Sequence, residues 1–369
     1  MKEQYRCHSC GITYNVTENV WKCICGGVLD LVKEKVTIDV DKLQEKMPTM
    51  WRYIDVMPFE KNSKVWKTIT MGEGNTPLIV LDDSEPHTLV KVDYMMPTLS
   101  FKDRGAAVLI AKAKELGVKS VIADSSGNAG TSIAAYAKRA NITCDIFLGK
   151  GTSPKKIAQV KAHGANVHEI AGTREDVAEA AQKAVNEEKK FYASHVYNPY
   201  FYEGTKTYAY EIWEQLKEAP DTLIIPVGNG TLLLGAYYGF KELIENQLIN
   251  KMPRLVAIQA DNCAPLAQAF VKSETHAKPI EGNPTLAEGI AIAAPARSAQ
   301  ILEAIRATEG EILTVNEEEI LEARALLAGK GFYVEPTTAA NYAGYLKYSH
   351  LPSKKIIIPL CGAGIKANL

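Results

Sequence analysis

Short apolar segments alternate with amphipathic segments along most of this chain. The apolar runs have the length and residue types of buried strands, and they occupy residues 119–124, 143–148, 166–170, 222–227, 255–259 and 355–360. Segments with the helical spacing of apolar positions lie at residues 106–113, 129–140, 154–163, 174–188 and 231–244. This alternation predicts an α/β fold in which helices cover both faces of parallel sheets.

Glycine-rich turns follow three of the predicted strands, at the carboxyl ends where ligands bind in such folds. Residues 125–130 (SSGNAG) open a helix, and free backbone N–H groups there suit a carboxylate, although an ordinary helix start uses similar residues. Residues 228–231 (GNGT) suit a single phosphate, because they lack both the dinucleotide fingerprint and the lysine of a triphosphate loop. Residues 361–364 (CGAG) follow the last strand.

Lys102 lies between a loop at residues 97–100 and the apolar helix at residues 106–113. Most lysines at a helix start are solvated surface residues. Burial beside a cationic neighbour such as Arg104 instead favours the neutral amine that attacks a carbonyl, although Arg104 and Asp103 would equally pair with each other. With the phosphate-binding and carboxylate-binding turns, this lysine indicates a Schiff base with pyridoxal phosphate.

Five motifs in order resemble those of the threonine synthases, which belong to the tryptophan-synthase-β-like, fold type II class of pyridoxal phosphate enzymes. They are SFKDRG at residues 100–105, SSGNAG at 125–130, EGTKT at 203–207, PVGNGT at 226–231 and CGAG at 361–364. An N-terminal cysteine cluster followed by GEGNTPL at residues 72–78 is also similar to that family. The resemblance covers nearly the whole chain and implies two doubly wound α/β domains with a small N-terminal element.

The resemblance also implies roles for individual residues. Lys102 would form the Schiff base and move the α-proton. The other cofactor contacts would come from Phe101 beside the ring, Asn128 at the 3'-oxygen, Cys361 at the pyridine nitrogen, and the phosphate cradle of Gly228, Asn229, Gly230 and Thr231. The substrate contacts would come from Ser125, Ser126, Gly127, Asn128 and Ala129, with Lys156 and Asn198 as further candidates.

The activity implied by the resemblance converts O-phospho-L-homoserine to L-threonine and phosphate, by γ-elimination and β-addition of water. Three positions depart from the family. Ala129 replaces a threonine, Phe201 stands where an arginine binds the substrate phosphate, and Ala363 replaces a histidine. Lys155 or Lys156 is a candidate replacement for the missing charge, although both suit a solvated helix surface. Two alternatives therefore stay open: β-elimination or β-replacement on another amino acid, as in a serine or threonine ammonia-lyase or a phosphoserine-dependent synthase, and a non-catalytic pyridoxal-phosphate-binding protein.

The N-terminal cysteines Cys7, Cys10, Cys23 and Cys25 follow the pattern C-x2-C-x12-C-x-C. In a reducing compartment, two such pairs separated by a hairpin suit a tetrahedral zinc ion. The second pair is spaced by one residue instead of two, so a metal-free ribbon is the alternative. Either element would be structural, because four sulfur ligands leave no open position on the metal.

The expected organisation has three parts: a zinc-ribbon-like element at residues 1–33, a large cofactor-binding domain at 34–104 and 196–369, and a small substrate-loop domain at 105–195. A net charge of -1 argues against nucleic-acid partners. No apolar run approaches the roughly 20 residues of a membrane span, and the N-terminus lacks a signal-peptide core. We expect a cytoplasmic protein with a small amino-acid substrate and no membrane partner, and the resemblance implies a homodimer.

Overall fold

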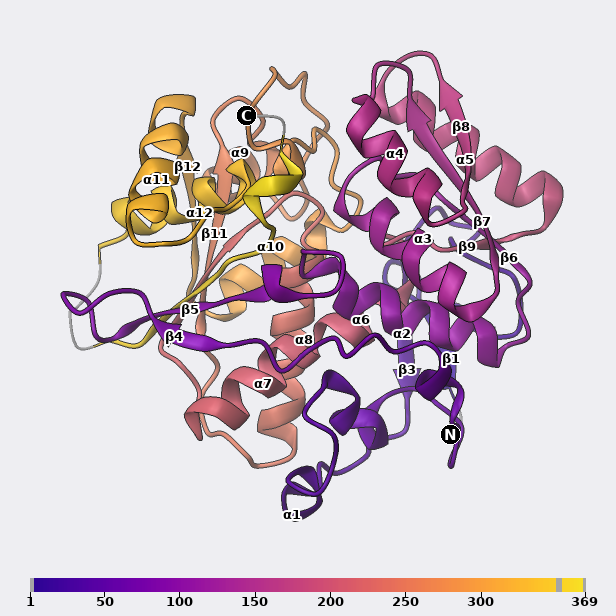
Figure 1. Ribbon diagram of the computed structural model, residues 1–369, viewed down its shortest axis with the longest axis horizontal. Helices are drawn as coiled ribbons and strands as arrows, with labels where there is room; N and C mark the ends of the chain where they lie inside the picture. Colours follow the sequence, from indigo (N-terminus) through magenta and orange to yellow (C-terminus); the bar gives the residue numbers. More distant parts are fainter. Residues whose placement is uncertain (1–2, 350–353, 368–369) are drawn as a thin grey trace. The chain divides into compact units, whose positions relative to one another are not determined.

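The computed structural model describes residues 3–349 and 354–367 (Figure 1). The chain forms two compact units. The first unit comprises Met1–Glu73 and Lys102–Gly204, and the second comprises Gly74–Phe101 and Thr205–Leu369. The chain therefore changes unit between Phe101 and Lys102. The division into a ribbon, a large domain and a small domain stays a prediction.

A small antiparallel sheet opens the first unit. Strand β1 (Glu3–Cys7) lies between β2 (Thr13–Asn15) and β3 (Leu29–Lys33), in the order β2-β1-β3. Three short helices follow: α1 (Val40–Leu43), η1 (Met50–Val56) and η2 (Val65–Thr68). The charged stretch after the ribbon thus contains a helix of only one turn.

Four parallel strands form the main sheet of the first unit, in the order β8-β7-β6-β9. Their bounds are β6 (Ser120–Ala123), β7 (Thr143–Gly149), β8 (Asn166–Ile170) and β9 (Phe191–Tyr192). The helices of this unit are α2 (Lys102–Glu115), α3 (Asn128–Ala140), α4 (Pro154–Ala162), α5 (Arg174–Glu188) and α6 (Pro199–Thr205). Because the strands are parallel, α3, α4 and α5 all begin at the carboxyl edge of the sheet.

A mixed sheet forms the second unit, in the order β12-β11-β10-β13-β5-β4. Its strands are β4 (Leu78–Val80), β5 (Thr88–Lys91), β10 (Thr222–Pro226), β11 (Arg254–Ala260), β12 (Glu311–Val315) and β13 (Ile356–Pro359). The expectation of wholly parallel sheets was wrong at one edge, where β4 runs antiparallel to β5. The short connection between these two strands has no crossover helix, so the chain turns back on itself.

The helices of the second unit follow its strands. They are η3 (Asp93–Met95), α7 (Thr207–Leu216), α8 (Thr231–Glu245), α9 (Pro265–Val271), η4 (Glu288–Ile290), α10 (Ser298–Ala307), α11 (Glu317–Gly329), α12 (Pro336–Lys347) and η5 (Gly364–Lys366). No helix among the described residues is both long enough and apolar enough to cross a membrane.

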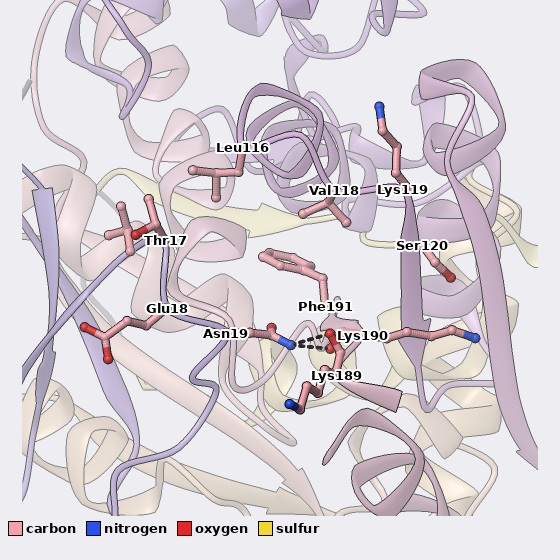
Figure 2. Close-up of a pocket in the computed structure, with 11 residues that line it drawn as sticks. Thr17, Glu18, Asn19, Leu116, Val118, Lys119, Ser120, Lys189, Lys190 and Phe191 are labelled. Atoms are coloured by element: carbon pink, nitrogen blue, oxygen red, sulfur yellow. Dashed lines mark hydrogen bonds between the residues drawn. The ribbon is translucent and has the colours of Figure 1, made fainter. Parts of the chain in front are cut away.

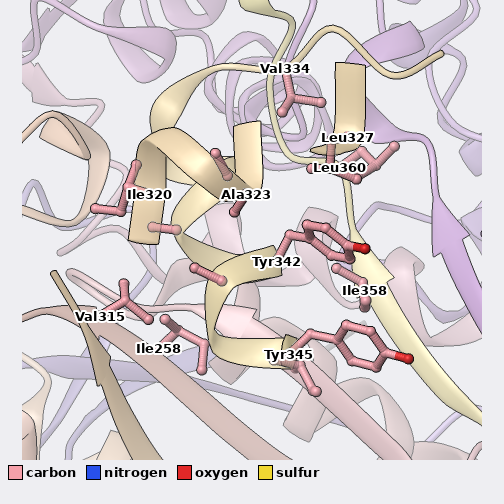
Figure 3. Close-up of a cluster of buried hydrophobic side chains, with 14 of the residues drawn as sticks. Ile258, Val315, Ile320, Ala323, Leu327, Val334, Tyr342, Tyr345, Ile358 and Leu360 are labelled. Carbon is pink, nitrogen blue, oxygen red and sulfur yellow. The ribbon is translucent and has the colours of Figure 1, made fainter. Parts of the chain in front are cut away.

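Helix α12 carries much of the core of the second unit (Figure 3). The Tyr342 and Tyr345 rings stack with their centroids 5.7 Å apart. They belong to a buried cluster that includes Ile258 of β11, Ile358 of β13 and Leu327 of α11. Close packing of this kind holds the strands rigidly, so the turns at their ends have defined positions.

The apolar pattern predicted the strands β6, β7, β8, β10, β11 and β13 and the helices α2, α3, α4, α5 and α8. The observed β8 and α5 coincide with the predicted residues 166–170 and 174–188, and the other predicted elements differ mainly at their ends. The pattern did not reveal β4, β5, β9 or β12, nor the helices α6, α7 and α9 to α12. Of these strands, β9 has two residues, and β4 and β12 are mostly exposed or half-buried. Short or partly exposed strands lack the continuous apolar run on which the prediction depends.

Two ion pairs join the ribbon to helices of the same unit. Lys112 of α2 contacts Glu3 of β1, and the Lys33 Nζ of β3 lies 2.6 Å from Glu203 Oε2 of α6. All four side chains are largely buried. Since removing one partner would leave a buried charge, these pairs fix the ribbon against α2 and α6.

Another buried ion pair organises the second unit. The Lys91 Nζ of β5 lies 2.8 Å from Glu211 Oε2 of α7, and the two side chains are 0% and 2% exposed. Lys91 also donates to the Thr76 carbonyl at 2.6 Å and to Gln215 Oε1 at 3.0 Å. Glu211 in turn accepts the Asn75 N–H at 2.7 Å. The pair therefore holds Asn75 and Thr76 against α7.

We expect Lys91→Met to lower the free energy of unfolding by about 3 to 5 kcal/mol, because Glu211 would keep a buried charge without its cation. Urea unfolding measures this loss, and the double variant Lys91→Met/Glu211→Met should recover part of it. The control is Lys42→Met, whose pair with Asp39 is exposed and should contribute little to stability. Similar losses of unfolding free energy in Lys91→Met and Lys42→Met would show that the Lys91–Glu211 pair does not organise the second unit.

Candidate active site

The segment before Lys102 is held by the turn that follows β13. Phe101 donates its backbone N–H to the Cys361 carbonyl at 2.9 Å, and Ser100 forms an antiparallel bridge with Gly362. Leu99 adopts a left-handed conformation with φ +63° and accepts the Ala363 N–H at 3.1 Å. The structure thus brings together Phe101 and Cys361, which are more than 250 residues apart in the sequence.

Lys102 begins α2 in the first unit, and its surroundings there are well defined. Its Nζ lies 5.8 Å from the centre of the Phe201 ring. The next residue, Asp103, is fully buried and accepts the Ser132 hydroxyl of α3 at 2.5 Å, which joins the starts of α2 and α3. A Cβ at Gly105 would lie 2.3 Å from the Phe201 ring, so the glycine of SFKDRG permits this close packing.

The turn at residues 125–127 connects β6 to α3. The Gly127 N–H donates to Ser125 Oγ at 3.4 Å, and α3 begins at Asn128 without a side-chain cap. Residues 125–128 are half-buried. Uncapped N–H groups in the first turn, with the helix dipole behind them, form a suitable site for a carboxylate.

The phosphate cradle expected from the sequence forms a tight turn in the second unit. It connects β10 to α8, with Gly230 at φ +73° and no side-chain cap on the helix. A Cβ at Gly228 would lie 2.6 Å from the Ile292 side chain and 3.1 Å from the Gly289 carbonyl oxygen. The backbone is therefore covered on one side by residues 289–292 and needs glycine at this position.

These residues fit pyridoxal phosphate. The cradle at residues 228–231 lies at a helix start without a side-chain cap, which suits a phosphate, and Cys361 is buried with 1% exposure. The Ser100 Oγ, two residues before Lys102, is buried and has no hydrogen-bond partner among the described residues. A buried hydroxyl without a partner suits a polar ligand group at this position.

Asn198 and Lys156 are the two remaining residues predicted to contact the substrate. Asn198 uses both ends of its side-chain amide within the fold, because it donates to the Tyr192 carbonyl at 3.2 Å and accepts the Tyr200 N–H at 3.2 Å. It therefore positions the start of α6. Lys156 lies in the first turn of α4 and is half-buried, and its backbone N–H donates to the Ser153 hydroxyl at 3.5 Å.

His195 is a residue near Lys102 that the sequence did not reveal. It follows β9, is 8% exposed, and its ring centroid lies 6.0 Å from that of Phe201. Burial lowers the pKa of His195 well below its usual range, and the positive charges of Lys102 and Arg174 act in the same direction. The imidazole is therefore neutral at neutral pH. An isolated histidine in an apolar segment gives no sequence signal that distinguishes it from a packing residue.

Asp124 is a second such residue, and it directly precedes the turn at residues 125–127. Its Oδ1 is buried without a hydrogen-bond partner among the described residues. Burial raises the pKa of Asp124 to about 6, against the opposing effects of Tyr192 and of the Arg174 charge. The sequence signal for Asp124 is a carboxylate that directly follows an apolar strand, at the edge of the sheet where ligands bind.

The four N-terminal cysteines meet at one end of the ribbon. Their sulfur atoms all lie within 4.8 Å of one another, with Cys7 and Cys25 at 3.5 Å and Cys10 and Cys23 at 3.5 Å. Tetrahedral zinc with Zn–S bonds of about 2.3 Å requires sulfur atoms about 3.8 Å apart, so this donor set fits the metal. The Tyr14 hydroxyl lies 3.1 Å from Cys23 Sγ, where it suits a coordinating thiolate.

A separate cavity of about 320 Å³ lies between the ribbon and the main sheet of the first unit (Figure 2). It is lined by Thr17 and Asn19 of the ribbon and by Leu116, Val118 and Phe191. Asn19 closes one side by donating to the Lys189 and Lys190 carbonyls at 2.8 and 3.0 Å. The cavity adjoins the first residues of β6 and β9, so it lies at the sheet edge opposite the turn at residues 125–127.

Comparison with known proteins confirms the resemblance seen in the motifs. Residues 69–362 match the family described as pyridoxal-phosphate dependent enzyme. The threonine synthase of Methanocaldococcus jannaschii is 36% identical over 354 residues, which cover 93% of this chain and 86% of that protein. The threonine synthase of a Bacillus species is 38% identical over 310 residues, which cover 81% of this chain and 85% of the relative.

Solved structures share the fold at lower identity. Maize serine racemase has a TM-score of 0.69 at 20% identity, covering 89% of this chain and 94% of the other. Threonine deaminase isoform 2 from Solanum lycopersicum has a TM-score of 0.68 at 21% identity, covering 90% and 87%. The α/β fold with mixed sheets is therefore that of the fold type II pyridoxal phosphate enzymes.

We expect Asp124→Asn to become more stable relative to the parent protein as the pH rises. The folded-state pKa of about 6 exceeds the ordinary value of 3.8, so the parent loses stability between those two pH values and bears the full cost of a buried charge above them. From pH 4 to pH 8 the difference in unfolding free energy should change by about 2 to 3 kcal/mol in favour of the variant. Urea unfolding at the two pH values measures it, with the exposed Asp83→Asn as the control. A difference independent of pH for Asp124→Asn would show that this carboxyl is solvated.

Proposed function

Because the chain belongs to the pyridoxal-phosphate dependent enzymes and, within them, to the threonine synthase family, we propose that it converts O-phospho-L-homoserine and water to L-threonine and phosphate. The observation that carries this proposal is the position of Lys102. It begins α2 directly after a segment that is hydrogen-bonded to the Cys361 turn, and the next residue, Asp103, accepts a hydrogen bond from Ser132 of α3. A lysine so placed suits the covalent attachment of the cofactor and the movement of substrate protons.

Bound pyridoxal phosphate supplies an electron sink for the carbons of the amino-acid substrate. We propose that Lys102 holds the cofactor and moves the protons, that residues 228–231 hold its phosphate, and that Asn128 bonds its 3'-oxygen. Phe101 packs beside the ring in this proposal. Orientation of the reacting bonds by such fixed contacts is the main contribution that a protein makes to cofactor chemistry.

The proposed partner of the pyridine nitrogen is the Cys361 thiol. Its Sγ–H points to the Pro359 carbonyl at 3.8 Å, and the residue is buried. A weakly polar thiol does not stabilise a protonated pyridine nitrogen. The cofactor would then be a weaker electron sink, which favours elimination over transamination.

The turn from Ser125 through Ser126, Gly127 and Asn128 to Ala129 is the proposed site of the substrate carboxylate. The uncapped start of α3 provides backbone donors for it. Lys156 and Asn198 remain candidates for contacts with the rest of the substrate, although the Asn198 amide is already engaged within the fold.

One observation favours a second candidate function. Phe201, which stands at the position expected to bind the substrate phosphate, is fully buried against Gly105 and carries no charge. A pocket with this residue suits a less charged amino acid, as in β-elimination or β-replacement by a serine or threonine ammonia-lyase.

We also propose a three-part organisation, with a ribbon at residues 1–33, a cofactor-binding domain at 34–104 and 196–369, and a substrate-loop domain at 105–195. A homodimer in the cytoplasm completes this proposal. The cysteines of the described residues are all free thiols, which suits a reducing compartment.

The protein loaded with pyridoxal phosphate should release threonine and phosphate in equal amounts from O-phospho-L-homoserine. The visible absorbance of the bound cofactor should change in Lys102→Ala, and turnover should fall by at least about a thousandfold, because the group that moves the protons is lost. The measurements are phosphate, threonine and ammonia release, with L-serine, L-threonine and O-phospho-L-serine as parallel substrates.

Two results of this panel would contradict the proposal. Ammonia and a keto acid from serine or threonine, without turnover of O-phospho-L-homoserine, would establish the second candidate function. A protein that binds no cofactor would exclude both enzymatic functions.

We propose that Cys7, Cys10, Cys23 and Cys25 hold a structural zinc ion. The closed set of four sulfur atoms supports this role, and the edge-on packing of Trp21 against Tyr192 and Tyr197, at 5.2 and 5.1 Å, connects the ribbon to the main sheet. A metal here would therefore stabilise the ribbon against the sheet rather than react.

The purified protein should contain one zinc ion per chain, and Cys10→Ser should lose it and melt at a lower temperature, because one of the four ligands is gone. Cys10 is exposed, so its replacement removes little packing. Elemental analysis and thermal unfolding measure the two effects, with the buried Cys144→Ser as a control that keeps the metal. Zinc-free protein with an unchanged melting temperature in Cys10→Ser would indicate a metal-free ribbon.

A further inference from the structure

A phosphorylated substrate needs a cation in the site, and this inference rests on the proposed function. A guanidinium group matches phosphate well because it donates two parallel hydrogen bonds. The helix α6 offers no such group, since Phe201 is fully buried with its ring against Gly105. Other elements of the first unit do carry cations.

Few positively charged residues lie in the first turns of the helices that begin at the carboxyl edge of the sheet in the first unit. Lys102 begins α2, and its amine is reserved for the cofactor in the proposed function. The remaining ones are Arg174, the first residue of α5, and Lys155 and Lys156 in the first turn of α4. The packing of α5 distinguishes among them.

The first turn of α5 packs against the strands that end beside the proposed site. Val177, three residues after Arg174, is buried in a cluster with Ile122 of β6 and Tyr192 of β9. The chain continues from β6 into Asp124 and the turn at residues 125–127, and from β9 towards His195. Arg174 therefore lies near the carboxyl ends of both strands.

The electrostatic effects agree with this placement. The Arg174 charge acts on both Asp124 and His195, and the Lys102 charge acts on the same His195. Arg174 and Lys102 thus lie within electrostatic range of one imidazole. Arg174 is exposed, so its guanidinium is accessible to a ligand.

We infer that Arg174 binds the phosphate of the substrate, in place of the arginine that is absent at Phe201. The chemical class it selects is an amino acid with an anionic group at the end of its side chain. Lys102 and the turn at residues 125–127 would hold the amino-acid end, and Arg174 would hold the opposite end. This arrangement makes Arg174 a specificity-determining residue of the proposed reaction.

The test compares Arg174→Gln and Arg174→Lys with the parent enzyme loaded with pyridoxal phosphate. Arg174→Gln should raise KM for O-phospho-L-homoserine about 10- to 100-fold, the effect expected for one charge-assisted contact, with a smaller change in kcat. Arg174→Lys should recover only part of the loss, because an ammonium group cannot donate in the same forked geometry. A merely structural role of Arg174 would not separate KM from kcat in this way.

Direct binding gives a second measurement that does not require turnover. The ligands are 2-amino-5-phosphonopentanoate, which carries a similar anionic end, and L-norleucine, which lacks one, and the cofactor absorbance reports their binding. Arg174→Gln should weaken binding of the phosphonate about 10- to 100-fold and leave that of norleucine unchanged. The matched control is Lys183→Gln, which removes a positive charge from an exposed position on the same helix, nine residues further along.

The outcomes separate this inference from the proposed function. Unchanged KM and phosphonate affinity in Arg174→Gln would overturn the inference, and a large loss in Lys156→Gln alone would assign the charge to Lys156. An enzyme that binds the phosphonate through Arg174 but does not convert O-phospho-L-homoserine would retain the inference and lose the proposed function. An enzyme that binds no phosphonate would overturn the inference whatever it converts.

Discussion

The hydrogen bond from the Phe101 N–H to the Cys361 carbonyl determines where Lys102 begins its helix. It joins a segment near the first third of the chain to the turn after the last strand. The bridge between Ser100 and Gly362 and the left-handed conformation of Leu99 support the same contact. A lysine that reacts with one atom of a cofactor needs a backbone held in a fixed position, because an error of about 1 Å in position can lower the rate about a hundredfold. The proposed roles of Phe101, Lys102 and Cys361 all depend on this contact.

The first unit gathers ionisable groups at one edge of its sheet. Asp124, Arg174, His195 and Lys102 come from four separate segments, and parallel strands bring three of those segments to the same edge. Burial keeps His195 neutral and raises the pKa of Asp124 to about 6, and the positive charges of Lys102 and Arg174 both act on His195. Such an edge suits a substrate that carries a carboxylate and a phosphate, which is the chemical basis for combining the proposed function with Arg174.

The ribbon is part of the first unit rather than an independent appendage. Its strands β1 and β3 contribute Glu3 and Lys33 to buried ion pairs with α2 and α6. These two helices also carry Lys102 and Phe201. A metal held by the four cysteines would therefore stabilise a sheet that is anchored on the helices of the proposed site, without a part in the reaction.

The sequence by itself determined the family, the cofactor class and the helices and strands with strong apolar periods. Motifs such as SFKDRG and GNGT are local, and the order of five such motifs along the chain is distinctive. Only the tertiary structure decided which residues surround Lys102. His195, Asp124 and Arg174 belong to no motif, and they lie near one another because parallel strands and the packing of Val177 bring their segments together. The antiparallel β4 and the meeting of Phe101 with Cys361 depend likewise on contacts between segments, which the apolar pattern of one segment does not encode.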